Sequence, residues 1–238
     1  MSSIKLSAQK LKDASNLQKV ATAWREAVIN RDWVIDGTTH DGPKYIIGFA
    51  RQLAGQGKTN TSDIILNDPY VYLSPGDKYA SKLKGQGKSV STEAIGCLQN
   101  GVIGYTYCYT YATNCIVTNE YIFSYCFMLN LPSHAPLNTT PLGFSRGLNK
   151  SGLWDEVSGL YGSKGGCVIY CDGHITWFDG SKPAKFLKWD QSGYTSDIRE
   201  TVPNSTWITC TNSIDKVKAA YKGEDALAII CHQGTGGE

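Results

Sequence analysis

The chain has 238 residues, with 23 basic and 21 acidic side chains and a formal net charge of +2. This balance, without a dense run of Lys or Arg, argues against a partner as anionic as a nucleic acid. Only 18% of the residues are charged, below the roughly 25% usual in soluble domains, while Gly and Tyr are frequent, which favours short strands, turns and ordered loops.

The N-terminal segment predicts a helix from Ile4 to about Ile29. Its second half carries one apolar stripe at spacings of three and four, formed by Leu17, Val20, Ala21, Trp24, Ala27 and Val28. The first half has few apolar residues, which is compatible with a helix start that projects from the body. We expect the helix to end before the Asp36-Gly37 turn signal. Residues 1–36 then form the N-terminal helix, and 37–238 form a globular body with a Cys-rich C-terminal region.

The body is predicted to consist mostly of strands. Short strands are expected at 45–49 and 70–73, with a helical turn at 50–54 and two longer strands at 102–111 and 116–131, where β-formers are concentrated. A hairpin is expected from 166–170 and 174–178, around the two-residue turn Asp172-Gly173. A late strand at 207–210 and a helix at 214–228 complete the chain. The predicted fold class is α+β, with one long helix packed on an antiparallel sheet.

The eight cysteines contain no CxxC pair, which argues against a structural zinc site. An even number of dispersed cysteines favours disulfides in an oxidising compartment, against the alternative of buried thiols in a reducing one. On one strand, Cys167 and Cys171 are about 13 Å apart, too far for a mutual bond. The candidate disulfide residues are Cys97, Cys108, Cys115, Cys126, Cys167, Cys171, Cys210 and Cys231.

Two segments resemble one protein family. The first is Ser15-Asn16-Leu17-Gln18-Lys19-Val20, preceded by Ala8-Gln9-Lys10-Leu11-Lys12. The second runs from Gly165-Gly166 through an apolar strand to Asp172-Gly173-His174, with Pro141 to Leu148 and Gly152-Leu153-Trp154 upstream. These resemble the start of the exported body and the C-terminal signature of type II secretion pseudopilins and type IV pilin-like proteins.

The resemblance implies a pilin-like fold and a structural subunit of a pseudopilus or pilus-like filament in a bacterial secretion system. It implies other pilin-like subunits as partners through the N-terminal helix, together with secretion-system components, and no nucleic acid. No stretch of the sequence reaches the ~18 apolar residues of a membrane helix, and the first twenty residues lack a signal-peptide core. The membrane is therefore expected only through a segment absent from this sequence, and the body is expected in the periplasm or at the cell surface.

No catalytic residue and no resident cofactor are predicted. Gly165, Gly166, Asp172, Gly173 and His174 are interpreted as a structural motif, because the Asp-Gly pair supplies a turn. The alternative is a small cysteine hydrolase with Cys171 as nucleophile beside a His-Asp pair.

Calcium is a further candidate, because some proteins of the resembling family bind it in a C-terminal loop. Asp179, Asp190 and Asp197 lie in loop-like sequence after the hairpin, although no EF-hand spacing is present. The alternative interpretation is that each of these carboxylates caps a turn.

Tyrosines alternate along one predicted strand and place four rings on one face, at Tyr105, Tyr107, Tyr109 and Tyr111. Such a face packs well in a half-buried sheet. It also fits the main alternative function, a secreted carbohydrate-binding or adhesin-type module.

Overall fold

The computed structural model describes residues 3–39, 42–43, 46–55, 63–77, 98–99, 102–103, 124–131, 133–156, 159–203, 205–209 and 228–232. The fold is α+β, as predicted, with a long N-terminal helix and a sheet that is antiparallel over most of its width. The helices are α1 (Ser3–Arg25), continued by a π-helical turn at Glu26–Asn30, and α2 (Ile46–Leu53). Short 3₁₀ turns lie at Pro69–Tyr72, Gly162–Lys164 and Ile198–Thr201.

The largest sheet among the described residues has six strands in the order β11-β12-β5-β6-β7-β8. Its members are β5 (Tyr125–Leu129), β6 (Pro141–Ser145), β7 (Gly165–Tyr170), β8 (Ile175–Asp179), β11 (Ser205–Thr209) and β12 (Ala228–His232). Neighbours from β12 to β8 pair antiparallel, whereas β11 and β12 run parallel.

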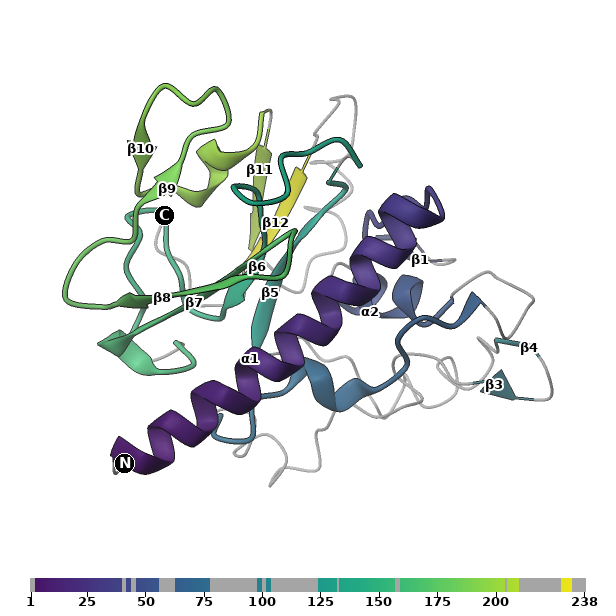
Figure 1. Cartoon of the computed structure of the whole chain (residues 1–238), viewed down its shortest axis with the longest axis horizontal. Helices are drawn as coiled ribbons and strands as arrows, with labels where there is room; N and C mark the ends of the chain where they lie inside the picture. The colour runs from purple at the N-terminus through teal and green to yellow at the C-terminus, as the bar shows by residue number, and fades with distance from the viewer. Residues whose placement is uncertain are drawn as a thin grey trace.

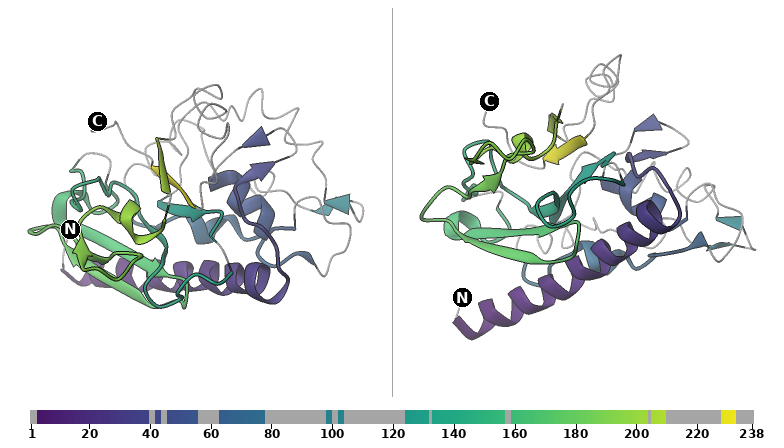
Figure 2. Two further views of the ribbon diagram at one scale, coloured as in Figure 1. Left: turned by 90° about the horizontal axis from the view of Figure 1, so that it is seen from above. Right: turned by 45° about the horizontal axis from the view of Figure 1, so that its top comes forward.

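Three two-stranded ribbons accompany this sheet: β1 (Thr38–Thr39) with β2 (Gly42–Pro43), β3 (Leu98–Gln99) with β4 (Val102–Ile103), and β9 (Phe186–Leu187) with β10 (Tyr194–Thr195). Figures 1 and 2 show α1 lying along one side of the main sheet. The β9–β10 ribbon lies across β7 and β8 from the first half of α1 (Figure 1). The body therefore offers two separate surfaces, one beside the helix and one at this ribbon.

The core lies between the second half of α1, α2 and the inner strands. Every member of the predicted apolar stripe of the helix is buried, from Leu17 to Val28. Phe49 of α2 stacks on Phe127 of β5 with ring centroids 4.6 Å apart, and the Tyr72 ring meets Phe127 edge-on. Such contacts between aromatic rings add packing energy beyond the area that they bury. They join α2 and the 3₁₀ turn at Pro69–Tyr72 to the sheet.

The predicted strand at 45–49 is wrong, because residues 46–53 form α2. Ile46, Phe49, Ala50 and Leu53 recur at helical spacing, and a short apolar run does not distinguish a strand from a buried helix. The predicted strand at 70–73 is also wrong. Asp68 accepts a hydrogen bond from the Tyr70 N–H and caps the 3₁₀ turn that begins at Pro69.

Other predicted elements are confirmed in part. The late strand is present as β11, and β5 lies within the strand predicted at 116–131. Of the strand predicted at 102–111, only Val102–Ile103 lies in the described residues. The helix predicted at 214–228 lies outside them except for Ala228, which begins β12. The strand β12 was not predicted from the sequence.

The predicted hairpin is confirmed as β7 and β8, and its loop consists of residues 171–173, which the predicted strand ends leave between them, instead of a two-residue turn at Asp172-Gly173. Tyr170 and His174 close a three-residue loop: the Tyr170 N–H donates to the His174 carbonyl at 3.0 Å, and the Gly173 N–H donates to the Tyr170 carbonyl at 2.9 Å. Gly173 has a φ of 93°. Three-residue hairpin loops need a residue in this left-handed region, and glycine adopts it without steric cost.

Candidate functional site

A buried polar junction holds the first half of α1 against the body. Asp13 is fully buried, and its carboxylate accepts hydrogen bonds from three hydroxyl groups. Ser74 donates to Oδ2 at 2.9 Å, Tyr125 donates to Oδ1 at 2.7 Å, and Tyr161 donates to Oδ2. The donors come from the segment after the 3₁₀ turn, from β5 and from the loop before β7. One helix carboxylate thus connects three parts of the body.

Two amides extend this junction along the same helix face. Gln9 donates to the Ser74 hydroxyl at 3.0 Å, and Asn16 donates to the carbonyls of Tyr70 and Leu73 at 3.4 and 3.3 Å. Gln9, Asp13 and Asn16 are spaced by four and three residues, so they lie on one face and continue the apolar stripe toward the N-terminus. The first half of the helix therefore packs on the body from Gln9 onward, instead of projecting from it.

A buried ion pair lies next to this junction. The Arg146 guanidinium donates two hydrogen bonds of 2.8 Å to the Asp77 carboxylate, and the two side chains are 3% and 1% exposed. The Ser124 hydroxyl donates to Asp77 at 2.7 Å and accepts from the Ser74 N–H at 2.8 Å. Ser74 thereby joins the ion pair to Asp13, and the junction is one continuous network.

Asp13 and the two tyrosines that donate to it have raised pKa values. Burial raises the pKa of the Asp13 carboxyl above its ordinary value, and the hydrogen bonds from Tyr161, Tyr125 and Ser74 only partly offset this effect. The negative charge of Asp77 adds to the increase. The pKa values of Tyr125 and Tyr161 are also raised, mainly by burial and further by the nearby Asp13, so both phenols stay protonated as donors. The arrangement suits positioning of the helix rather than proton transfer at a surface.

The hairpin beside the helix contains the predicted structural motif. Adding a Cβ atom to Gly166 would place it 2.2 Å from both the Ser145 hydroxyl and the Trp154 indole nitrogen. Those two atoms form a 3.0 Å hydrogen bond, and Ser145 also accepts the Cys167 N–H at 3.0 Å. A Cβ atom on Gly165 would lie 2.0 Å from the Phe178 carbonyl, and Gly165 has a φ of 106°. The Gly-Gly pair is therefore required where β7 meets its neighbours.

The turn residues have structural contacts. Asp172 Oδ1 accepts the His174 N–H at 3.0 Å and lies 2.6 Å from His174 Nδ1, while the His174 ring stacks on Tyr170. Arg25 of α1 contacts the Asp172 carbonyl at 3.5 Å. Burial and the nearby Asp172 charge raise the pKa of the Cys171 thiol well above its ordinary range. This disfavours the thiolate that a Cys171 nucleophile requires.

Three of the eight cysteines have described side chains. Cys126, Cys167 and Cys171 are buried and form no disulfide with one another in the described part of the chain. Each packs inside the sheet or its turn, as small apolar side chains do. Burial raises the pKa of Cys167 to about 12. The side chains of Cys97, Cys108, Cys115, Cys210 and Cys231 lie outside the described part of the structure, as does the Tyr105 to Tyr111 segment.

The three calcium candidates cap turns. Asp179, Asp190 and Asp197 each accept the N–H of the residue two positions later, at 2.9 to 3.0 Å. Nowhere in the described ranges do three or more His, Cys, Asp or Glu side chains gather closely enough to hold a metal ion. The contacts of these carboxylates are those of the alternative interpretation, in which each stabilises a local turn.

The outer surface of α1 differs from its buried face. Leu11 is 74% exposed on the outer surface. The neighbouring Lys10 contacts the sheet, with its ammonium group 4.9 Å from the centroid of the Trp177 ring of β8. Within the described residues, no helix combines the length and the apolarity required to cross a bilayer.

The Gly-Gly and Asp-Gly positions were predicted from the sequence, but the polar junction was not. A signal for it was present, because Gln9, Asp13 and Asn16 continue the helical period of the apolar stripe. Polar residues at those positions are ordinarily interpreted as solvated. Their partners Ser74, Tyr125 and Tyr161 are also far away in the sequence.

Comparisons with known proteins identified no relative: no protein-family model, no curated protein and no solved structure matches this chain.

Proposed function

We propose that this chain is the exported body of a pilin-like structural subunit, in which α1 continues into a filament and the rest of the chain carries the exposed surface. The observation that carries the proposal is the two-sided character of α1. One face is held in the body by directional polar contacts from Gln9 to Asn16, and another presents Leu11 at 74% exposure. A helix arranged in this way joins a body to neighbouring subunits.

The position of the motif residues supports the same proposal. The segments with the family resemblance, widely spaced in the sequence, pack as one unit. Trp154 donates to Ser145 of β6, Ser145 accepts from Cys167 of β7, and Lys10 of α1 lies over Trp177 of β8. Gly165 and Gly166 are points of close approach within this unit. The residues of the motif determine how the helix packs on the sheet, and this favours a role in assembly over a catalytic role.

The proposal includes a cell-surface or periplasmic location, pilin-like neighbours and secretion-system components as partners, and no catalytic role. It is tested by site-specific photo-crosslinking of the protein expressed from its natural gene in its own host. A photoreactive p-benzoylphenylalanine in place of Leu11 is expected to give a ladder of covalent multimers of this chain or of chains with similar helices. The control is the same substitution at Ser181, which is exposed beyond the end of β8. A monomer at both positions, or a protein recovered only from the cytosol, would refute the assembly role.

A further inference from the structure

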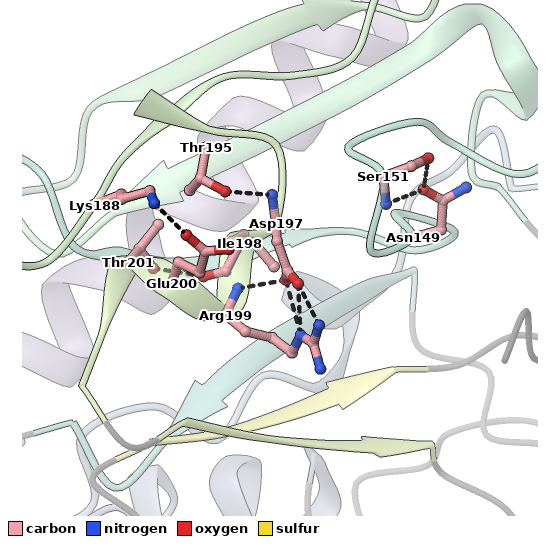
Figure 3. Close-up of polar contacts among 9 residues, drawn as sticks. All are labelled: Asn149, Ser151, Lys188, Thr195, Asp197, Ile198, Arg199, Glu200 and Thr201. Atoms are coloured by element: carbon pink, nitrogen blue, oxygen red, sulfur yellow. Dashed lines mark hydrogen bonds and ion pairs between the residues drawn. The ribbon is translucent and has the colours of Figure 1, made fainter. Parts of the chain in front are cut away.

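A shallow pocket of about 390 Å³ lies on the side of the molecule away from the first half of α1. It is formed by the turn between β9 and β10 and by the 3₁₀ turn at Ile198–Thr201. Figure 3 shows the polar contacts of these turns. The lining residues are Lys188, Trp189, Asp190, Asp197, Arg199, Glu200 and Val202. The volume falls near the lower end of the ~300–1,000 Å³ range of small-molecule sites.

The backbone of the pocket is held by hydrogen bonds. The Lys188 N–H donates to the Gly193 carbonyl at 3.0 Å, the Gln191 N–H donates to the Lys188 carbonyl at 3.0 Å, and the Trp189 N–H donates to the Glu200 carbonyl at 2.9 Å. Gln191 has a φ of 59°, a conformation that costs energy for a residue with a side chain. The backbone hydrogen bonds of this turn fix the positions from which its side chains project, which lowers the entropy cost of binding.

Most charges in the pocket are neutralised by partners within it. Lys188 Nζ lies 3.0 Å from Glu200 Oε2, and the Arg199 guanidinium and backbone N–H both donate to Asp197 (Figure 3). With Asp190, the formal charge of the lining is −1. This surface offers several carboxylate acceptors but little attraction for an anionic ligand. It suits a ligand that is neutral and carries several hydroxyl donors.

Trp189 supplies the apolar part of the pocket. Its side chain is 56% exposed although its backbone is fixed to Glu200, so an indole ring is held at the surface beside polar groups. An aromatic ring next to hydrogen-bonding side chains matches a pyranose sugar, which has a flat face of C–H groups and an edge of hydroxyls.

We propose that this pocket is a binding site for a neutral sugar of one or two units, with one pyranose face stacked on Trp189 and hydroxyls donating to the carboxylates of Asp190 and Glu200. The site lies across β7 and β8 from the first half of α1, and its described lining residues all lie between positions 188 and 202. Sugar binding here requires no filament, so it is tested on the isolated chain independently of the assembly proposal.

The experiment is calorimetric titration of the isolated chain with neutral oligosaccharides of glucose, galactose, mannose and N-acetylglucosamine. At least one of these probes is expected to bind saturably. Trp189→Ala is expected to weaken that binding by about tenfold or more, whereas Trp189→Phe retains most of it. The matched control is Tyr70→Ala, which removes an aromatic side chain of similar exposure (69%) far from the pocket and is expected to leave the affinity unchanged.

Several outcomes would overturn the proposal. These are the absence of saturable binding to every neutral probe, equal binding by Trp189→Ala and the unchanged chain, and a preference for uronic-acid oligosaccharides or for peptides. Loss of binding in Tyr107→Ala but not in Trp189→Ala would assign the sugar to the tyrosine segment instead. Because Trp189 is more than half exposed, the variants are expected to keep the wild-type circular dichroism spectrum. If Trp189→Ala does not keep this spectrum, the affinities of Trp189→Phe and Asp190→Asn are compared instead. Retained binding by Trp189→Phe with weaker binding by Asp190→Asn supports the proposal, and unchanged binding by Asp190→Asn overturns it.

Discussion

Replacing Arg146 with methionine tests whether the buried ion pair is part of the structural support of α1. The guanidinium and the Asp77 carboxylate are 3% and 1% exposed and share two hydrogen bonds of 2.8 Å. Methionine fills a similar volume but leaves the Asp77 charge buried, close to the Asp13 carboxyl whose pKa Asp77 already raises. Removing one partner of a buried pair costs about 3–5 kcal/mol of unfolding free energy. With a urea m-value of about 2–3 kcal/mol/M, the midpoint is expected to fall by about 1–2 M.

The assay is urea unfolding at neutral pH, followed by tryptophan fluorescence. The double variant Asp77→Asn/Arg146→Met removes the uncompensated charge but keeps an acceptor for Ser124, so it is expected to be more stable than Arg146→Met alone. The control Lys188→Met breaks a solvent-exposed pair with Glu200 and is expected to cost less than about 1 kcal/mol. A cost below about 1 kcal/mol for Arg146→Met, or additive costs in the double variant, would refute the reasoning.

Three further predictions concern the junction, the hairpin and the thiols. The raised pKa of Asp13 means that the folded state holds its proton more tightly than the unfolded state, so its contribution to stability decreases as the pH rises above about 3.8. Urea unfolding should show this slope in the wild type but not in Asp13→Asn, and parallel profiles would contradict it. Gly166→Ala is expected to lower the unfolding free energy by about 3 kcal/mol, because the new Cβ overlaps two hydrogen-bonded atoms. Gly173→Ala, with nothing closer than 3.9 Å, should cost only the backbone penalty of about 1–2 kcal/mol, and equal losses would refute the steric argument. Peptide mapping after alkylation of the native protein should find Cys167 and Cys171 unmodified until the chain unfolds, and rapid labelling would contradict their burial.

The parts predicted correctly from sequence are those whose signal is local. The stripe from Leu17 to Val28 repeats at helical spacing, and its burial follows directly from that repeat. Asp172-Gly173 indicated a hairpin because glycine at that position removes a steric cost. The two-residue turn expected at Asp172-Gly173 is not formed, because the backbone contacts of Tyr170, and not the dipeptide alone, determine where pairing ends.

The parts that were missed depend on contacts between distant segments. The 46–53 segment contains both a strand-like run and a helical repeat, and its packing of Phe49 on Phe127 favours the helix. Asp13 is buried because Ser74, Tyr125 and Tyr161 supply three donors, the last of them 148 residues away. No local pattern indicates that a charged helix residue will find such partners. The pocket that Trp189 lines similarly requires β9, β10 and the following 3₁₀ turn to be placed together.

The polar face of α1 has a mechanical consequence. An apolar stripe resists separation from a sheet but tolerates sliding, because one set of methyl groups replaces another after a shift of one helical turn of about 5.4 Å. The hydrogen bonds of Gln9, Asp13 and Asn16 have no such equivalent position: a shift by one turn breaks all of them together. A force applied along the helix axis is therefore borne by several bonds in parallel. The first half of α1 therefore transmits tension along its axis to the body without sliding on the sheet.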